Sequence, residues 1–292
     1  TAMPLIVLIA CAAVGSVLSL LRMRRPVGRT MRDPGTPTLA ICTVGGALLL
    51  GYRWLVVSPA GLLIDAHVDG LLLIATLFAA TVLYIRLRAR VPGIAIFALP
   101  VLAVLLAWAL CASAWTYHPF AIDGVAGVWA VVHLGGVYVG TFFCLLAAIA
   151  GAMYLYVNRR LRNKDHVEQL GRFASLETLE RLNIQAAALG FGILTLGLVT
   201  GVILVSQSPG RMGEGWWYSP KVLLAVVVWG IYAVVMNVRH TTSFRGVRAA
   251  WLSIVGMVLL VAVYAIVNHT PASAATPGAA DTAHAPVARE VL

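Results

Sequence analysis

The sequence predicts an all-α membrane protein, a polytopic bundle of about eight transmembrane helices with both termini on the non-cytoplasmic side. Three observations predict it. First, 61% of the 292 residues are hydrophobic and only 11% are charged, against about 25% charged residues in soluble domains. Second, the apolar residues are gathered in runs long enough to cross hydrocarbon about 30 Å thick. Third, the basic residues alternate from one side of these runs to the other.

Eight apolar runs follow one another along the chain. Backbone polar groups inside a bilayer must be satisfied within their own segment, so runs of this length predict helices. Strands of a membrane barrel would instead show ~10-residue alternating segments. The fifth run has 30 residues, about 45 Å as a helix, and must tilt or project from the membrane. The runs are residues 4–21, 38–57, 67–87, 94–112, 127–156, 185–206, 219–238 and 249–268.

The first run could be mistaken for a secretory signal. However, Arg22, Arg24 and Arg25 follow this run rather than precede it, and no small-residue cleavage site is evident. We therefore predict a spanning helix whose amino end lies outside. Because the chain begins with Thr1 rather than Met, we expect the start of translation to lie further upstream.

The basic residues orient the runs. Seventeen of the 21 Lys and Arg residues fall in four alternate connections, after the first, third, fifth and seventh runs. This asymmetry is the positive-inside rule, and it places both termini outside the cytoplasm. It also explains the net charge of +10 by topology and lipid headgroups, so a nucleic-acid partner is not expected. The basic residues left for the opposite side are Arg53, Arg211, Lys221 and Arg289.

Tryptophan and histidine gather on the predicted outer side. One interfacial Trp would be ordinary, but intramembrane and juxtamembrane His residues are rare and usually functional. Haem uses this combination: its iron takes imidazole nitrogen as an axial ligand, its porphyrin packs on aromatic side chains, and its propionates prefer Arg or Lys. We therefore predict a haem site there. The residues are Trp54, Trp115, Trp129, Trp216, Trp217, His67, His118, His133 and His269.

His133 is the best single candidate for an iron ligand. It follows Trp129 by four residues, which places both on one helical face. Gly136 and Gly140 continue this face and leave room for a flat ligand or a neighbouring helix. The alternative is that the two glycines form a small-xxx-small helix contact, across which His133 only makes a hydrogen bond.

His67 has two possible roles. Asp65, His67 and Asp69 alternate and would suit a metal ion only in an extended strand, because on a helix His67 points away from the two acids. His67 could otherwise be a second haem contact at the entrance of the third helix. The four cysteines lie inside spans without paired spacing, and we expect them to be packing residues.

From Trp129 to His269 the chain resembles the CcsA/HemX-like cytochrome c assembly proteins, polytopic membrane proteins that handle haem on the outer face. Trp129 to His133 is similar to the family's Trp…His opening, and Ser175 to Asn183 resembles its LETLDRLN segment. Three further stretches follow in the family's order. They are Gly190–Gly201, similar to GFxLLTxGxxTG; Arg245–Trp251, similar to RGRRAAW; and Val267–Asn268, similar to its late VN.

The resemblance implies a haem site and three units. His133 and His269 would ligate the iron, and Trp216, Trp217 and Lys221 would line the porphyrin edge. The units are an N-terminal four-helix half over 1–126, a family-like four-helix half with the external Trp loop over 127–269, and a disordered tail over 270–292. The tail is rich in Ala, Pro and Thr and has too little apolar content to fold.

The chain departs from the family in the Trp loop that forms its haem-binding signature, WGxxWxWDPKExW. Trp216, an aromatic residue at Tyr218, Pro220 and Lys221 remain. Three other positions differ, namely Ser219, Val222 and Leu224, and Asn237 stands where full synthase components carry a membrane-embedded His. This pattern favours the HemX-like branch.

The leading functional prediction is a haem-binding membrane protein of cytochrome c biogenesis in the bacterial inner membrane. It would present haem outside, where thiols of an apocytochrome c attack the vinyl groups, with a second membrane subunit as partner. It could thus be a component of a haem lyase, or cytochrome c synthase. Two alternatives stay open: a HemX-like regulator of haem biosynthesis acting through the cytoplasmic segment 157–184, and a structural or electron-transfer subunit of a membrane complex.

Overall fold

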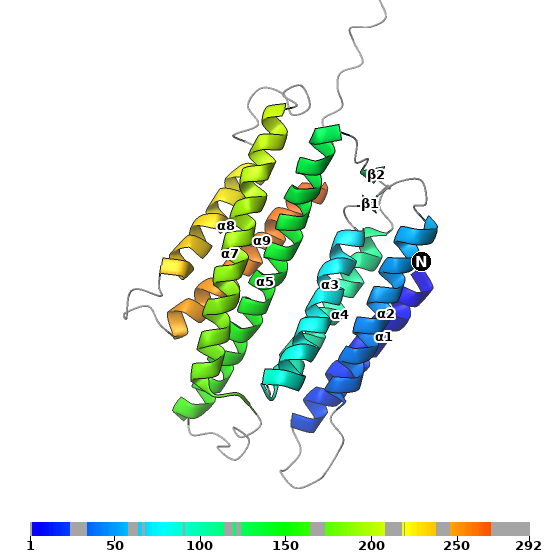
Figure 1. Ribbon diagram of the computed structural model, residues 1–292. Helices are drawn as coiled ribbons and strands as arrows, with labels where there is room; N and C mark the ends of the chain where they lie inside the picture. The colour runs from blue at the N-terminus through cyan, green and yellow to red at the C-terminus, as the bar shows by residue number, and fades with distance from the viewer. Residues whose placement is uncertain are drawn as a thin grey trace, which may run out of the picture.

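The structure is a computed structural model, in which the described helices run alternately up and down along one common direction (Figure 1). The N-terminal helices are α1 (Ala2–Met23), α2 (Gly35–Tyr52), α3 (Val68–Tyr84) and α4 (Ile94–Ala112). The C-terminal helices are α5 (Gly124–Asn163), α7 (Leu176–Gln207), α8 (Pro220–Asn237) and α9 (Val247–His269). The structure describes residues 2–23, 34–57, 64–65, 68–89, 91–113, 119–120, 124–163, 173–207, 218, 220–237 and 246–269.

The predicted all-α fold class is confirmed. Each predicted apolar run coincides with one described helix, and the only strands in the described part of the chain are β1 (Ile64–Asp65) and β2 (Pro119–Phe120), paired antiparallel. Two helices end in π-helical turns, α2 through Arg53–Val57 and α3 through Ile85–Ala89.

Among the residues that the structure describes, six helices, α1 to α5 and α7, are long and apolar enough to cross a membrane. The described apolar parts of α8 and α9 are shorter, Val222–Val234 and Val247–Val263. The chain is therefore an integral membrane protein. Eight crossings and the outer placement of both termini remain predictions.

Two helices extend beyond their predicted apolar runs, both at the arginine-rich end of the bundle. α5 has 40 residues, about 60 Å at 1.5 Å per residue, and α7 begins at Leu176 rather than at 185. Hydropathy marks only the part of a helix that lies in hydrocarbon, whereas Leu, Glu and Arg continue a helix into water. The start of α7 is capped by Ser175, whose Oγ accepts a hydrogen bond from the Thr178 N–H at 3.2 Å.

Small and polar residues hold the C-terminal helices together. α5 packs along α7 and also touches α9, while α8 lies against α7 and α9. Asn183 of α7 is buried between helices, where its Nδ2 donates to the Ala147 carbonyl at 2.7 Å and its Oδ1 accepts from Ser253 Oγ at 3.3 Å. These two hydrogen bonds of Asn183 join α7 to α5 and to α9. Such bonds matter in a membrane because lipid supplies no hydrophobic force between helices.

Helices α3 and α4 connect the N-terminal helices to α5. At one contact Gly70 of α3 faces Tyr138 of α5, where a Cβ on the glycine would lie 2.5 Å from the tyrosine hydroxyl oxygen. Only glycine therefore lets the two helices meet at this point. The predicted division of the chain into 1–126, 127–269 and a tail stays a prediction, and the tail lies outside the described residues.

Candidate functional site

The interface between α5 and α7 is built on glycines. A Cβ on Gly136 would lie 2.9 Å from the Gly197 Cα, and one on Gly140 would lie 2.7 Å from the Leu194 Cγ. Both distances are shorter than real Cβ contacts, so the backbones meet here because side chains are absent. The room that Gly136 and Gly140 leave is thus taken by a neighbouring helix, which is the packing role considered above.

His133 lies beyond Gly136 on the side of this interface nearer the start of α5, and one of its ring nitrogens makes a hydrogen bond. Its Nδ1 lies 2.7 Å from the Gly197 carbonyl oxygen. A carbonyl can only accept, so Nδ1 carries the hydrogen and donates it. In a neutral imidazole the lone pair is then on Nε2. Metal-ligating histidines commonly have this arrangement, with the second nitrogen bound to a backbone carbonyl that fixes the tautomer and the ring orientation.

Two residues of α7 shape the place where the imidazole lies. A Cβ on Gly201 would lie 2.7 Å from the His133 Cε1, so glycine makes room for the ring. Thr200 Oγ1 donates to the Leu196 carbonyl at 2.8 Å and also lies 3.0 Å from the Gly197 oxygen that His133 uses. The stretch Gly190–Gly201, which resembles a family motif, thus provides the surface of α7 against which the His133 imidazole packs.

Four other predicted site residues, namely Trp129, Tyr218, Lys221 and His269, belong to the same end of the bundle. The start of α5, the end of α7, the start of α8 and the end of α9 lie there together (Figure 1). Trp129 is partly buried on α5, four residues before His133, and Tyr218 is 81% exposed beside the start of α8. The backbones of Lys221 and His269 fall in the first turn of α8 and at the last residue of α9.

Several predicted residues cannot be placed. Trp216, Trp217 and His67 lie outside the described residues, and of Lys221 and His269 only the backbone is described. The structure therefore brings Trp129 and His133 together with the helix ends that carry Tyr218, Lys221 and His269. Their roles toward haem stay predictions.

Arg53 and Asp69 were noted in the sequence separately, and the structure joins them. Arg53 Nε donates to Asp69 Oδ1 in an ion pair that is buried on both sides. Single charges inside two apolar runs are the signal that could have predicted this pair, since intramembrane charges pair with one another. Among the residues that the structure describes, no group of three or more His, Cys, Asp or Glu side chains is placed to hold a metal ion.

The donors present fit a haem at this end of the bundle. With Nδ1 at the Gly197 carbonyl, Nε2 is the ring nitrogen left for iron, and Trp129 supplies an aromatic surface on the same helical face. Because α5 and α7 pack closely at Gly136 and Gly140, haem would have to meet His133 outside this interface.

Comparison with known proteins supports a family assignment. A profile of the family described as "Cytochrome C assembly protein" matches residues 65–272, which extends from β1 and α3 through α9. The chain is similar to the "Cytochrome c biogenesis protein CcsA" of Prochlorococcus marinus (strain NATL1A), at 30% identity over 114 residues, 39% of this chain and 35% of that protein.

Two further relatives carry the same name. That of Guillardia theta is 23% identical over 155 residues, 48% of this chain and 50% of that protein. That of Thermosynechococcus vestitus is 32% identical over 99 residues, 34% of this chain and 30% of that protein. The chain thus spans about a third to a half of the length of these relatives. No solved structure gave a significant match.

Proposed function

The chain belongs to the cytochrome c assembly protein family, and we propose that it binds haem at the outer end of its helix bundle and presents it for attachment to an apocytochrome c. The observation that carries the proposal is the imidazole of His133. Its Nδ1 is bound to the Gly197 carbonyl, so its Nε2 is the nitrogen left to ligate iron. This histidine stands on the first turns of α5, beside the helix ends that carry the Trp loop.

We assign each residue of the proposed haem site a role from its position. His133 and His269 are the two axial ligands, from the start of α5 and the end of α9. Trp129, Trp216, Trp217 and Tyr218 give the porphyrin aromatic and apolar contacts. Lys221, in the first turn of α8, is a cation for a propionate. His67, just before α3, is a further haem contact.

The chemistry of attachment belongs to haem and the apocytochrome. Haem supplies vinyl groups, to which the two thiols of a CxxCH segment add. This chain would hold the haem and orient its edge outward, so that the proposed enzyme is a haem lyase of which this chain is one component. We propose a second membrane subunit as its partner and the bacterial inner membrane as its location.

Maturation of a reporter cytochrome c tests the proposal. The chain would be produced in cells without their own assembly proteins, together with the partner subunit and an apocytochrome c. Haem that stays with the cytochrome on a denaturing gel measures attachment. We expect His133→Ala to lower attachment at least tenfold. Gly192→Ala is the matched control, because no atom lies within 4 Å of a Cβ built there on α7, and the change leaves the imidazole.

The outcomes separate the possibilities. Normal attachment with His133→Ala would disprove the ligand assignment. Haem on the purified wild-type protein without attachment to the cytochrome would refute the assembly role and leave haem binding standing. No haem and no attachment, with altered activity of haem-biosynthetic enzymes, would identify the chain as a regulator instead.

A further inference from the structure

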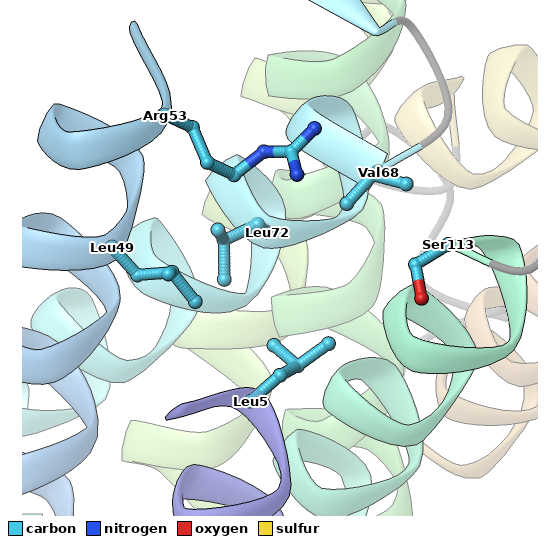
Figure 2. A pocket seen from close by; sticks show the side chains of 6 residues that line it. All are labelled: Leu5, Leu49, Arg53, Val68, Leu72 and Ser113. Atoms are coloured by element: carbon cyan, nitrogen blue, oxygen red, sulfur yellow. The ribbon is translucent and has the colours of Figure 1, made fainter. Parts of the chain in front are cut away.

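The N-terminal helices leave little room for a ligand at their outer end. Figure 2 shows the small pocket there, with Arg53 at one side of it. Arg53 is already paired with Asp69, and the pocket has room for about one water molecule. This pocket is too small for the edge of a haem, and the polar contacts that bear on haem lie around His133, between α5 and α7.

Three hydrogen-bond donors meet at the carbonyl oxygen of Gly197. Gly197 lies inside α7, so the backbone N–H of Gly201, four residues later, is directed at this oxygen. His133 Nδ1 lies 2.7 Å from it, and Thr200 Oγ1 lies 3.0 Å from it. A carbonyl oxygen has two lone pairs. The imidazole and the hydroxyl therefore compete for the lone pair that the helix leaves.

The Thr200 hydroxyl has a second acceptor. Its single hydrogen can go to the Leu196 carbonyl at 2.8 Å or to the Gly197 carbonyl at 3.0 Å. Thr200 is 6% exposed, so its hydroxyl is shared between these two carbonyls rather than given to solvent. With the hydrogen on Leu196, the Gly197 lone pair is left to His133. With the hydrogen on Gly197, the bond from His133 Nδ1 is weakened.

The strength of the Nδ1 bond matters at the other nitrogen of the ring. A firmer bond from Nδ1 to its acceptor raises the basicity of Nε2, which is the nitrogen proposed to ligate iron. Hydrogen bonds to an axial ligand are one of the means by which a protein sets the reduction potential of haem. A more basic Nε2 favours ferric over ferrous iron and so lowers this potential.

We propose that Thr200 is a positioning residue, which limits how firmly His133 holds haem iron by competing for the Gly197 carbonyl. The inference rests on the proposed function. It suits a chain that passes haem on, because such a chain must release the iron as well as hold it. Thr200 needs no contact with the haem, since it acts through the carbonyl that His133 uses.

Three variants of the whole chain test the proposal. Thr200→Val has nearly the shape of threonine and lacks the hydroxyl, and Thr200→Ser keeps the hydroxyl. Thr43→Val is the matched control, because Thr43 Oγ1 donates to the Leu39 carbonyl at 2.7 Å in the same way, on α2 rather than on α5 or α7.

Two measurements are made on each form in detergent. One is the reduction potential of the haem-loaded protein. The other is the NMR resonance of the proton on His133 Nδ1 in the haem-free protein, prepared with ¹⁵N-labelled histidine. The His133 signal is the one that is absent from His133→Ala.

We expect Thr200→Val to raise the ratio of ferric to ferrous haem affinity at least about threefold, which makes the potential about 28 mV more negative at about 59 mV per tenfold for one electron. In the haem-free protein the Nδ1 proton should move downfield, because its hydrogen bond becomes stronger. Thr200→Ser and Thr43→Val should match the wild type in both measurements.

The contrary results are equally definite. An unchanged or more positive potential in Thr200→Val, or an equal shift in Thr43→Val, would overturn the proposal. If the wild type binds no haem, the proposed function fails. The Nδ1 resonance of the haem-free protein then still decides whether Thr200 competes with His133, and an unmoved resonance in Thr200→Val would show that it does not.

Discussion

At the scale of single residues, Gly201 decides whether the His133 imidazole can lie against α7. A Cβ at Gly201 would come within 2.7 Å of the His133 Cε1, so Gly201→Ala must displace the ring or push the helices apart. We expect Gly201→Ala to lower stability by about 1–3 kcal/mol, as overpacking does. We also expect weaker haem binding, because Nδ1 loses the Gly197 carbonyl. Thermal unfolding of the purified protein in detergent measures the first effect.

Gly192 is the matched control on the same helix. No atom lies within 4 Å of a Cβ built there, so Gly192→Ala adds only helix propensity, up to about 1 kcal/mol. The melting temperature should therefore fall for Gly201→Ala and stay or rise for Gly192→Ala. An unchanged melting temperature for Gly201→Ala would show that His133 does not occupy this position.

Predictions about single residues could be made where they depend only on the spacing of residues within one helix. The four-residue spacing of Trp129 and His133 places them on one helical face without knowledge of the fold. By contrast, the bond from His133 to Gly197 depends on how α5 is aligned against α7, 64 residues apart in the chain. The partners of Asn183 could not be predicted from the sequence for the same reason. Asn183 lies in a motif that resembles the family, but its two interhelical partners, Ala147 and Ser253, depend on how the helices pack.

At the scale of elements, hydropathy located each helix but not its ends. The run predicted over 127–156 is a helix from Gly124 to Asn163, and its last turn carries Arg160 and Arg162. These residues contribute nothing to an apolar window but continue a helix well. The π-helical turn at Arg53–Val57 also has no signature in the apolar pattern.

The alignment of α1 against α2 follows from two glycine contacts. The two helices are antiparallel neighbours. A Cβ on Gly45 of α2 would lie 2.6 Å from Leu8 Cδ2 of α1, and one on Gly15 of α1 would lie 2.5 Å from Thr38 Cγ2 of α2. Leu8 of α1 thus faces Gly45 of α2, and Gly15 of α1 faces Thr38 of α2. Residue numbers that rise along α1 therefore fall along the facing side of α2, as in any antiparallel pair.

The same alignment places Cys11 opposite Cys42, midway between the two contacts, although the sequence showed no paired cysteine spacing. Both cysteines are free thiols. We predict that a short bifunctional thiol reagent, such as mercuric ion, links Cys11 to Cys42 within one chain, and mass spectrometry of the digested protein would detect the linked peptides. Cys111 and Cys144 are the internal controls and should stay unlinked. A link to either of them in place of the Cys11–Cys42 pair would contradict the alignment.

At the scale of the whole molecule, the arginine-rich helix ends and the Trp- and His-bearing ends lie at opposite ends of the bundle. We expect the first end in the cytoplasm, by the positive-inside rule. Alkaline phosphatase, which is active only outside the cytoplasm, tests this. A fusion after Gln207, the end of α7, should be active, and a fusion after Asn163, the end of α5, should be inactive. The reverse pattern would invert the topology and place the candidate haem site inside.

The class of the molecule was predictable because it rests on composition, which needs no contacts. The candidate site was predictable only in part. Its residues come from the ends of α5, α8 and α9, and the segment with Trp216 and Trp217 lies outside the described residues. The family match from residue 65 to 272 includes α3 and α4, so the matched region is wider than the stretch from Trp129 to His269 in which the resemblance was noted.

The optical spectrum of the purified wild-type protein, measured beside that of His133→Ala, tests whether the chain binds haem through His133. We predict a haem band in the wild type, at least tenfold weaker in the variant, and partly restored by added imidazole, which replaces the missing Nε2. Gly192→Ala, which changes α7 where no atom lies within 4 Å of the added Cβ, should keep the wild-type spectrum. Absence of haem from the wild type after loading would contradict haem binding, and an unchanged spectrum in His133→Ala would contradict His133 as the ligand.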